Sequence, residues 1–290
     1  MASDPFKFLE KEKPVELPLW REAFFGVEWL KLRTKPVALG FGVPRGNGDA
    51  VVLVPGFMGH DMYLTDMNLW LRWLGYRPYW SRIGLNTECP DLLLDRLLVT
   101  IRRAYNARGH VHLVGHSLGG LLARAAAVTE PQFIASVTTL GSPFRGIHSH
   151  PRILRTAKQL AKRLERRMYD RPPHKPLQRK CFTAHCQCPF AKAGRQGLPD
   201  HVYETAIYTQ NDGVVDWVAC KSDDPDVDFE VSGSHIGLAW NPEVYRIIGQ
   251  RLKEARTFVP APLRKLGVKR KSNDPPLISH PFVETASREN

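Results

Sequence analysis

Short apolar runs alternate with longer stretches of mixed polarity along most of this chain. Five runs are rich in apolar and β-branched residues, at 50–55, 111–114, 136–140, 205–209 and 227–231. Runs of this length suit strands that are buried on both faces, as in a parallel sheet. Four stretches between and after them carry apolar residues at helical spacing, at 68–74, 91–106, 118–128 and 242–255. This alternation predicts an α/β fold with a mostly parallel central sheet and helices on both faces.

The alternation breaks between residues 147 and 202. There a basic stretch with helical spacing, at 152–168, is followed by prolines and cysteines. An insertion at this point predicts a helical, cysteine-containing cap over the sheet. We therefore predict five parts: an N-terminal extension (1–35), two parts of the core (36–146 and 203–258), the cap (147–202) and a C-terminal tail (259–290).

Aromatic and charged residues are interleaved within the N-terminal extension. Trp20, Phe24, Phe25 and Trp29 lie among arginine, lysine and glutamate residues over positions 17–35. This pattern predicts an amphipathic helix that lies on a membrane or a partner, or one whose apolar face packs on the core. We favour packing on the core.

A candidate nucleophile lies between one predicted strand and the helix that follows it. The segment Gly115-His116-Ser117-Leu118-Gly119 starts directly after the run 111–114 and opens the helix 118–128. A catalytic serine needs such a sharp strand-to-helix turn, because the turn projects its hydroxyl away from the sheet. The turn crowds its neighbours, so Gly115 and Gly119 keep space clear. The pattern G-x-S-x-G is common by chance, but this context makes Ser117 the predicted nucleophile.

A serine hydroxyl needs a base to take its proton, and the base needs an acid that orients it. If the acid and then the histidine follow the serine in the chain, His235 is best placed, because it leaves the predicted strand 227–231. Asp212 leaves the end of the preceding strand, and Gly213 beside it would permit a tight turn. Asp216 is the alternative acid.

An acyl-transfer site also needs hydrogen-bond donors for the oxyanion that forms during attack. We predict two backbone N–H groups: that of Leu118, at the start of a helix, and that of Phe57, in the glycine-rich loop after the first strand. The surroundings of this loop and of the serine are expected to contact the substrate. The residues assigned to this role are Met58, His60, Tyr63 and His116.

Several of these segments together resemble one known superfamily. They are residues 55–59, 115–120, 140–143, 212–213, and 234–238 with Asn241-Pro242. They resemble the α/β-hydrolase superfamily and are most similar to its bacterial triacylglycerol lipases and esterases. The resemblance implies hydrolysis of a lipid or other apolar acyl ester through an acyl-enzyme intermediate, the triad named above, and no cofactor. One departure is Pro55-Gly56, where many lipases carry His-Gly.

Two other functions stay open. An acyltransferase would use the same triad and replace water with an alcohol as the acyl acceptor. A protein of this fold could also have lost catalysis and bind a membrane or a partner. The presence of candidates for all three triad positions argues against this second alternative.

The charge balance is strongly basic. The chain has 41 lysine and arginine residues against 29 aspartate and glutamate residues, a net charge of +12. Such a surface favours anionic lipid head groups, phosphate-bearing partners or acidic substrates, although a solvated basic surface would have the same composition. The basic stretch at 151–180 could touch an anionic membrane surface or form a solvated cap. We expect no nucleic-acid binding, because no recognised binding motif accompanies the charge.

The start of the chain and its cysteines bear on the compartment. Residues 1–14 lack the apolar region of a secretory signal, and no apolar run is long enough to span a membrane, so we expect a cytoplasmic protein, with membrane contact at most peripheral. Cysteines would then be thiols or metal ligands. Cys181, Cys186, Cys188 and Cys220 could be free thiols, disulfides that tie the cap to the core, or a four-thiolate zinc site. We assign no metal ligands.

Overall fold

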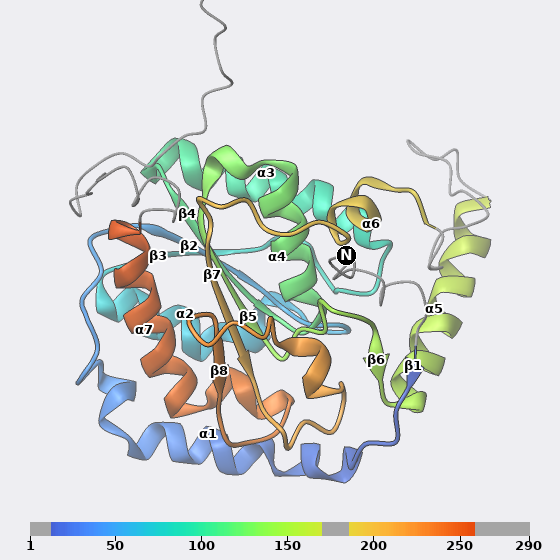
Figure 1. The fold of residues 1–290 in the computed structure, drawn as a ribbon, viewed down its shortest axis with the longest axis horizontal. Helices are drawn as coiled ribbons and strands as arrows, with labels where there is room; N and C mark the ends of the chain where they lie inside the picture. Colours follow the sequence, from blue (N-terminus) through green and yellow to red (C-terminus); the bar gives the residue numbers. More distant parts are fainter. Residues whose placement is uncertain (1–12, 170–185, 259–290) are drawn as a thin grey trace, which may run out of the picture.

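A six-stranded, fully parallel sheet forms the centre of the molecule (Figure 1). This computed structural model describes residues 13–169 and 186–258. The strands lie in the order β3-β2-β4-β5-β7-β8. Their bounds are β2 Ala50–Val54, β3 Arg77–Trp80, β4 Val111–His116, β5 Ile134–Leu140, β7 Tyr203–Tyr208 and β8 Asp228–Glu230. The α/β-hydrolase fold predicted from the sequence is confirmed.

Each face of the sheet is covered by helices. Residues of α3 (Pro90–Arg108) and α4 (Leu118–Thr129) build the core on one face, and residues of α2 (Thr65–Leu74) and α7 (Pro242–Thr257) build the core on the other. Successive side chains of a strand point to opposite faces. Every residue of β2 is therefore buried, although its side chains alternate between the two cores.

One strand lacks the apolar pattern that predicted the others. β3 has the sequence Arg-Pro-Tyr-Trp, with Arg77 exposed and the other three side chains half-buried. It lies at the edge of the sheet and pairs only with β2. A proline is tolerated there because an edge strand has unpaired N–H positions that need no partner strand. The strand escaped prediction because an edge position demands neither a continuous apolar run nor a full set of donors.

The described part of the insertion contains two helices and a short strand. β6 (His148–Ser149) leads into α5 (Pro151–Tyr169), and α6 (Pro189–Ala193) follows. β6 pairs in parallel with β1 (Lys13–Pro14), and Figure 1 shows both beside α5, on the right of the view. The basic helix predicted at 152–168 is thus present as α5. Cys181, residues 1–12 and the predicted tail at 259–290 lie outside the described residues.

The N-terminal helical segment, residues 19–34, packs on the protein in an unexpected orientation. It consists of η2 (Leu19–Phe24) and α1 (Phe25–Thr34), and it contacts η7 (Ile236–Trp240). Its glutamates, Glu22 and Glu28, are buried, whereas most of its aromatic side chains are exposed. The segment packs on the core, as we favoured, and it buries Leu32 together with the two glutamates. Among the described residues, no helix is both long and apolar enough to cross a membrane.

Candidate active site

Ser117 lies at a sharp turn between β4 and α4. Its backbone has φ 53° and ψ −123°, a left-handed conformation that is uncommon outside glycine. A Cβ atom on Gly115 would approach the carbonyl oxygen of Gly119 to 2.5 Å, and one on Gly119 would overlap the carbonyl oxygen of Val54. Glycine is therefore required on both sides of the serine, for the reason that the sequence predicted: the turn leaves no room for side chains.

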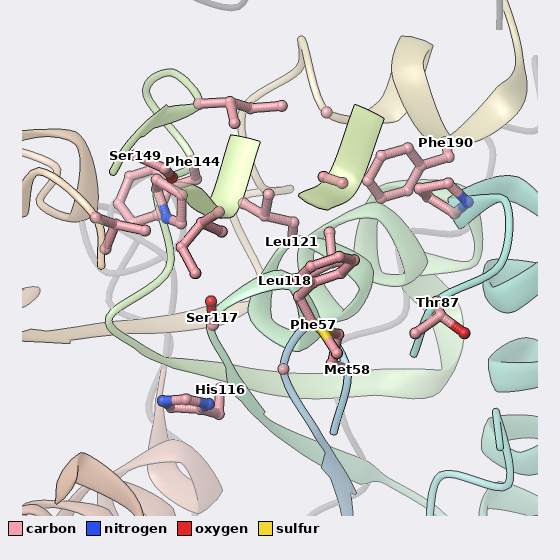
Figure 2. Close-up of a pocket in the computed structure, with 18 of the residues that line it drawn as sticks. Phe57, Met58, Thr87, His116, Ser117, Leu118, Leu121, Phe144, Ser149 and Phe190 are labelled. Carbon is pink, nitrogen blue, oxygen red and sulfur yellow. The ribbon is translucent and has the colours of Figure 1, made fainter. Parts of the chain in front are cut away.

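An apolar cavity of about 860 Å³ opens above this turn. Figure 2 shows the Ser117 hydroxyl pointing into the cavity, away from the His116 ring. The wall combines residues of the core with residues of the insertion. Apolar side chains that line it include Leu118, Leu121, Phe144, Ile147, Ile153 and Leu154. The insertion thus forms part of the wall of the space that the serine faces.

His235 and Asp212 form a buried pair beside this cavity. His235 Nδ1 lies 2.6 Å from Asp212 Oδ2, and both side chains are almost fully buried. The other carboxylate oxygen of Asp212 accepts hydrogen bonds from the backbone N–H groups of Val214 and Val215, both at 2.8 Å. His235 lines the same cavity as Ser117. The structure therefore brings together the three predicted triad residues, from the ends of β4, β7 and β8.

The alternative acid, Asp216, lies elsewhere. Its carboxylate accepts a hydrogen bond from the backbone N–H of Val218 at 3.2 Å and caps the helix η6 (Trp217–Cys220). Its nearest histidine is His148, with 3.8 Å between Nδ1 and Oδ2. Asp216 is thus a helix-capping residue, and the geometry favours Asp212 as the partner of His235.

The surroundings give two buried histidines of the site, His116 and His235, opposite protonation behaviour. Burial by itself lowers the pKa of His235, but the charges of Asp212 and Glu22 and the hydrogen bond that His235 donates to Asp212 outweigh it, so the pKa is raised. Burial, together with the nearby His235, lowers the pKa of His116 to about 3. His116 is therefore neutral at physiological pH, whereas His235 is tuned to take up a proton.

The two predicted oxyanion donors lie next to the serine and line the cavity. Leu118 is the first residue of α4, so its N–H has no partner within the helix. In the loop after β2, the N–H of Met58 already donates to the carbonyl oxygen of Asn86 at 2.9 Å. This bond removes Met58 as a donor and leaves Phe57 as the candidate in that loop.

The predicted substrate contacts divide into three groups. Met58 lines the cavity with an exposed side chain. Tyr63 and His116 also line it and bond to the histidine loop: the Tyr63 hydroxyl donates to the carbonyl oxygen of Ile236 at 2.6 Å, and His116 Nε2 donates to that of His235 at 2.9 Å. Among the described residues, His116 Nδ1 has no hydrogen-bond partner. His60 is not among the lining residues, because its ring accepts from the N–H of Met62 and caps a short helix.

Three buried polar residues that the sequence did not single out hold the site in place. Glu22 and Glu28 accept hydrogen bonds from backbone N–H groups around His235. Asn86 donates from its side chain to the carbonyl oxygen of Pro55 at 2.8 Å and so fixes the loop of Phe57. Glutamates among exposed aromatic residues look like the solvent face of a helix, so the sequence carried no signal for their burial.

Of the cysteines that the structure describes, Cys186 and Cys188 lie together and Cys220 lies apart from them. The described cysteines, Cys89, Cys186, Cys188 and Cys220, are not in disulfides. Cys186 and Cys188 line the cavity, with 3.3 Å between their sulfur atoms. Cys220 instead packs with Tyr208 and Val215, and its Sγ lies 3.7 Å from the carbonyl oxygen of Asp216. Within 13–169 and 186–258, no group of three or more side chains could hold a metal ion.

Comparisons with known proteins agree with this architecture. Residues 78–183 match the family model of the alpha/beta hydrolase fold. A triacylglycerol lipase of Burkholderia plantarii is 30% identical over 131 residues, 42% of this chain and 37% of the lipase. A triacylglycerol lipase of Pseudarthrobacter phenanthrenivorans is 34% identical over 106 residues, 33% of each chain. The matched region thus spans about a third of the length of these relatives.

A solved structure extends the likeness to most of the molecule. The crystal structure of a metagenomic carboxyl esterase superposes with a TM-score of 0.50 and 15% sequence identity, over 81% of this chain and 93% of the esterase. An identity this low speaks for the fold alone. Fold and sequence together show an α/β-hydrolase fold and a resemblance to bacterial lipases and esterases.

Proposed function

We propose that this α/β-hydrolase is a serine-dependent carboxylic ester hydrolase that acts on a lipid or another apolar acyl ester. The observation that carries the proposal is the 2.6 Å contact between His235 and Asp212 at the edge of the apolar cavity whose floor holds Ser117. An acid, a base and a strained serine that converge on one apolar space are the parts that acyl transfer needs. The lipases that match part of the chain support the same chemistry.

The reaction follows from the hydrogen-bond pattern. Asp212 can only accept from His235, so Nδ1 carries the hydrogen and Nε2 is the nitrogen that takes a proton. Ser117 Oγ attacks the acyl carbon while its proton passes to Nε2. The proton then goes to the leaving alcohol as the acyl–oxygen bond of the substrate breaks. Water next attacks the acyl-serine, gives its proton to His235, and releases the acid with the serine restored.

Charge that develops on the substrate carbonyl oxygen needs donors that are already in place. The N–H groups of Leu118 and Phe57 fill this role in our proposal. The adjacent N–H of Met58 is bonded within the protein, so it does not compete for the oxyanion. Asn86 holds the Phe57 loop through hydrogen bonds with Pro55, Met58 and Gly59.

Replacing Ser117 by alanine tests the assignment. The Ser117→Ala variant should fold normally and lose at least about a thousandfold in kcat on a short p-nitrophenyl ester, because no acyl-enzyme can form. It should also fail to react with a fluorophosphonate probe that labels the wild type. The matched control is Ser232→Ala, which removes an exposed serine of the histidine loop.

Three outcomes would decide among the alternatives. Unchanged turnover by Ser117→Ala would contradict the assignment of the nucleophile. A folded wild type that takes no probe would favour a binding protein without catalysis. An acyltransferase would use the same triad, so it is recognised by transfer of the acyl group to an added alcohol in preference to water.

A peripheral contact with an anionic membrane surface forms the second part of the proposal. The supporting observation is the outward-facing apolar surface of the N-terminal helical segment, which we call the aromatic face. Its exposed residues are Trp20, Phe24, Phe25, Val27, Trp29 and Leu30. Exposed lysines, Lys31 and Lys35, lie at its end. Aromatic and aliphatic side chains with flanking cations suit the interface of an anionic bilayer.

A further inference from the structure

We propose that Glu22 is a positioning residue for ester hydrolysis, because its buried carboxylate joins the loop of the acid to the loop of the base. This inference rests on the proposed function and adds a fourth residue to the triad's support. Glu22 comes from the N-terminal helical segment, outside the sheet and the loops that carry Ser117, Asp212 and His235.

The contacts of Glu22 reach both loops at once. Its Oε1 accepts from the N–H of Gly213, next to the acid, at 2.9 Å, and from the N–H of His235 itself at 3.0 Å. Its Oε2 accepts from the N–H of Ile236 at 2.7 Å. Glu22 is buried, so water cannot easily take the place of these hydrogen bonds, and losing one of them would be costly. One carboxylate thus holds three backbone N–H groups of two separate loops.

Glu28 contacts only one of the two loops that Glu22 joins. Its Oε1 accepts from the N–H of Ser234 at 3.0 Å, so it contacts the loop of the base but not that of the acid. Its Oε2 is buried and, among the described residues, has no hydrogen-bond partner. The bridge between acid and base therefore depends on Glu22, and Glu28 supports the base loop.

Two glycines leave room for these carboxylates. A Cβ atom on Gly213 would lie 2.9 Å from Glu22 Oε1 and 2.8 Å from the carbonyl oxygen of Pro18. A Cβ atom on Gly237 would lie 2.8 Å from the carboxylate carbon of Glu28. Gly213 has no left-handed φ, so the tight turn that the sequence suggested is not its reason. Each loop therefore has a glycine where the N-terminal helical segment packs against it.

The bridge matters because the triad tolerates little displacement. A misplacement of about 1 Å, even one caused far from the chemistry, can cost about a hundredfold in rate. Asp212 and His235 lie in loops that follow different strands, so their 2.6 Å contact depends on the relative position of two loops. Glu22 holds the backbones of both loops, so its contacts do not depend on the rotamers of Asp212 and His235.

Glu22 also adds charge next to the base. Three titratable groups face His235: Asp212, Glu22 and His116. His116 is neutral, as burial keeps its pKa near 3, so Asp212 and Glu22 provide the charge that raises the pKa of His235. Activity requires neutral His235 and therefore rises as the pH passes upward through this pKa. Loss of the Glu22 charge should lower the pKa and move the acidic limb to lower pH.

The Glu22→Gln variant tests both effects. A glutamine offers one acceptor oxygen, so its NH₂ group must face at least one of the three N–H donors and the bridge breaks. We expect the plateau kcat to fall by about ten- to a hundredfold, with KM for a short p-nitrophenyl ester nearly unchanged. The acidic limb of kcat/KM should move to lower pH. A merely structural role would not shift the limb.

Two further variants complete the design. Glu22→Asp keeps the charge but is one methylene shorter, so the plateau should fall while the acidic limb stays near that of the wild type. Glu243→Gln makes the same exchange at an exposed position of α7 and should leave both unchanged. If Glu22→Gln does not fold, Glu22→Asp decides: a wild-type plateau in that variant would overturn the bridge.

The outcome can be separated from that of the proposed function. An NMR titration of the His235 ring measures its pKa without any substrate. A wild type that hydrolyses no ester would refute the proposed function, and the titration would still test the effect of Glu22 on His235. An active wild type whose plateau, acidic limb and His235 pKa are all matched by Glu22→Gln would overturn the inference.

Discussion

At the scale of single residues, two aspartates four positions apart differ completely in their surroundings. Asp212 receives two backbone N–H bonds on one oxygen and His235 on the other. Asp216 caps a short helix. Both follow β7, so sequence spacing could rank them only by their distance from the strand end. Their hydrogen-bond partners separate them, because Asp212 contacts His235, 23 positions further along the chain, whereas Asp216 accepts from the nearby Val218.

Replacing each aspartate by asparagine should therefore give very different enzymes. Asp212→Asn should reduce kcat by about a thousand- to ten-thousandfold, because an amide can donate to Nδ1 and favour the wrong tautomer of His235. Asp216→Asn is the matched control and should retain wild-type kcat. The measurement is steady-state hydrolysis of a short p-nitrophenyl ester, with circular dichroism to check folding. Comparable losses in the two variants would contradict the assignment of the acid.

At the scale of elements, α5 combines two roles along one helix. Ile153, Leu154 and Ala157 line the cavity, whereas Arg152, Arg155 and Gln159 are exposed. From the sequence, this basic amphipathic helix could touch an anionic membrane surface or be a solvated helix whose apolar positions cover the active site. The structure places them over the space above Ser117, where a long acyl chain would lie.

Truncating Leu154 should therefore change substrate preference more than chemistry. In Leu154→Ala, the ratio of kcat/KM for a dodecanoyl ester to that for an acetyl ester should fall by about tenfold, since a few lost methylene contacts are worth about 1–3 kcal/mol. Gln159→Ala, on the exposed side of the same helix, should leave the ratio unchanged. An equal loss on both esters in Leu154→Ala would mean that α5 does not bind the acyl chain.

At the scale of the whole molecule, the aromatic face shares no residue with the lining of the cavity. We expect the protein to sediment with vesicles of phosphatidylglycerol and much less with vesicles of phosphatidylcholine, and the binding should weaken in high salt. Trp20→Ala and Phe24→Ala should each reduce binding by about tenfold, because each removes an apolar side chain that would enter the interface.

The control for this experiment is Val99→Ala, which truncates an exposed apolar residue of α3 on the opposite side of the sheet. It should bind vesicles as the wild type does. Equal binding by all variants, or none by the wild type, would contradict a membrane role for the aromatic face.

Sequence reasoning was most successful where one local pattern decides the structure. Five of the six strands and the serine turn follow from apolar runs and glycines, and the three candidate triad residues lie after the strands from which the sequence expected them to leave. The edge strand β3 escaped because its residues are only half-buried. The burial of Glu22 escaped for another reason: its partners, such as the N–H of His235, lie more than two hundred positions away. Cysteine spacing also could not show that Cys220 packs in a different part of the core from Cys186 and Cys188.

The N-terminal helical segment bears on which part of this protein could be exchanged with a relative as one unit. The described residues before Ala50 add no strand to the central sheet, so a topology diagram presents them as a detachable decoration. Yet they supply the Glu22 carboxylate, which joins the loop of the acid to the loop of the base. In a graft, a circular permutation or a recombination between relatives, the sheet and its loops would not transfer intact without this segment. The smallest exchangeable module therefore begins upstream of Glu22.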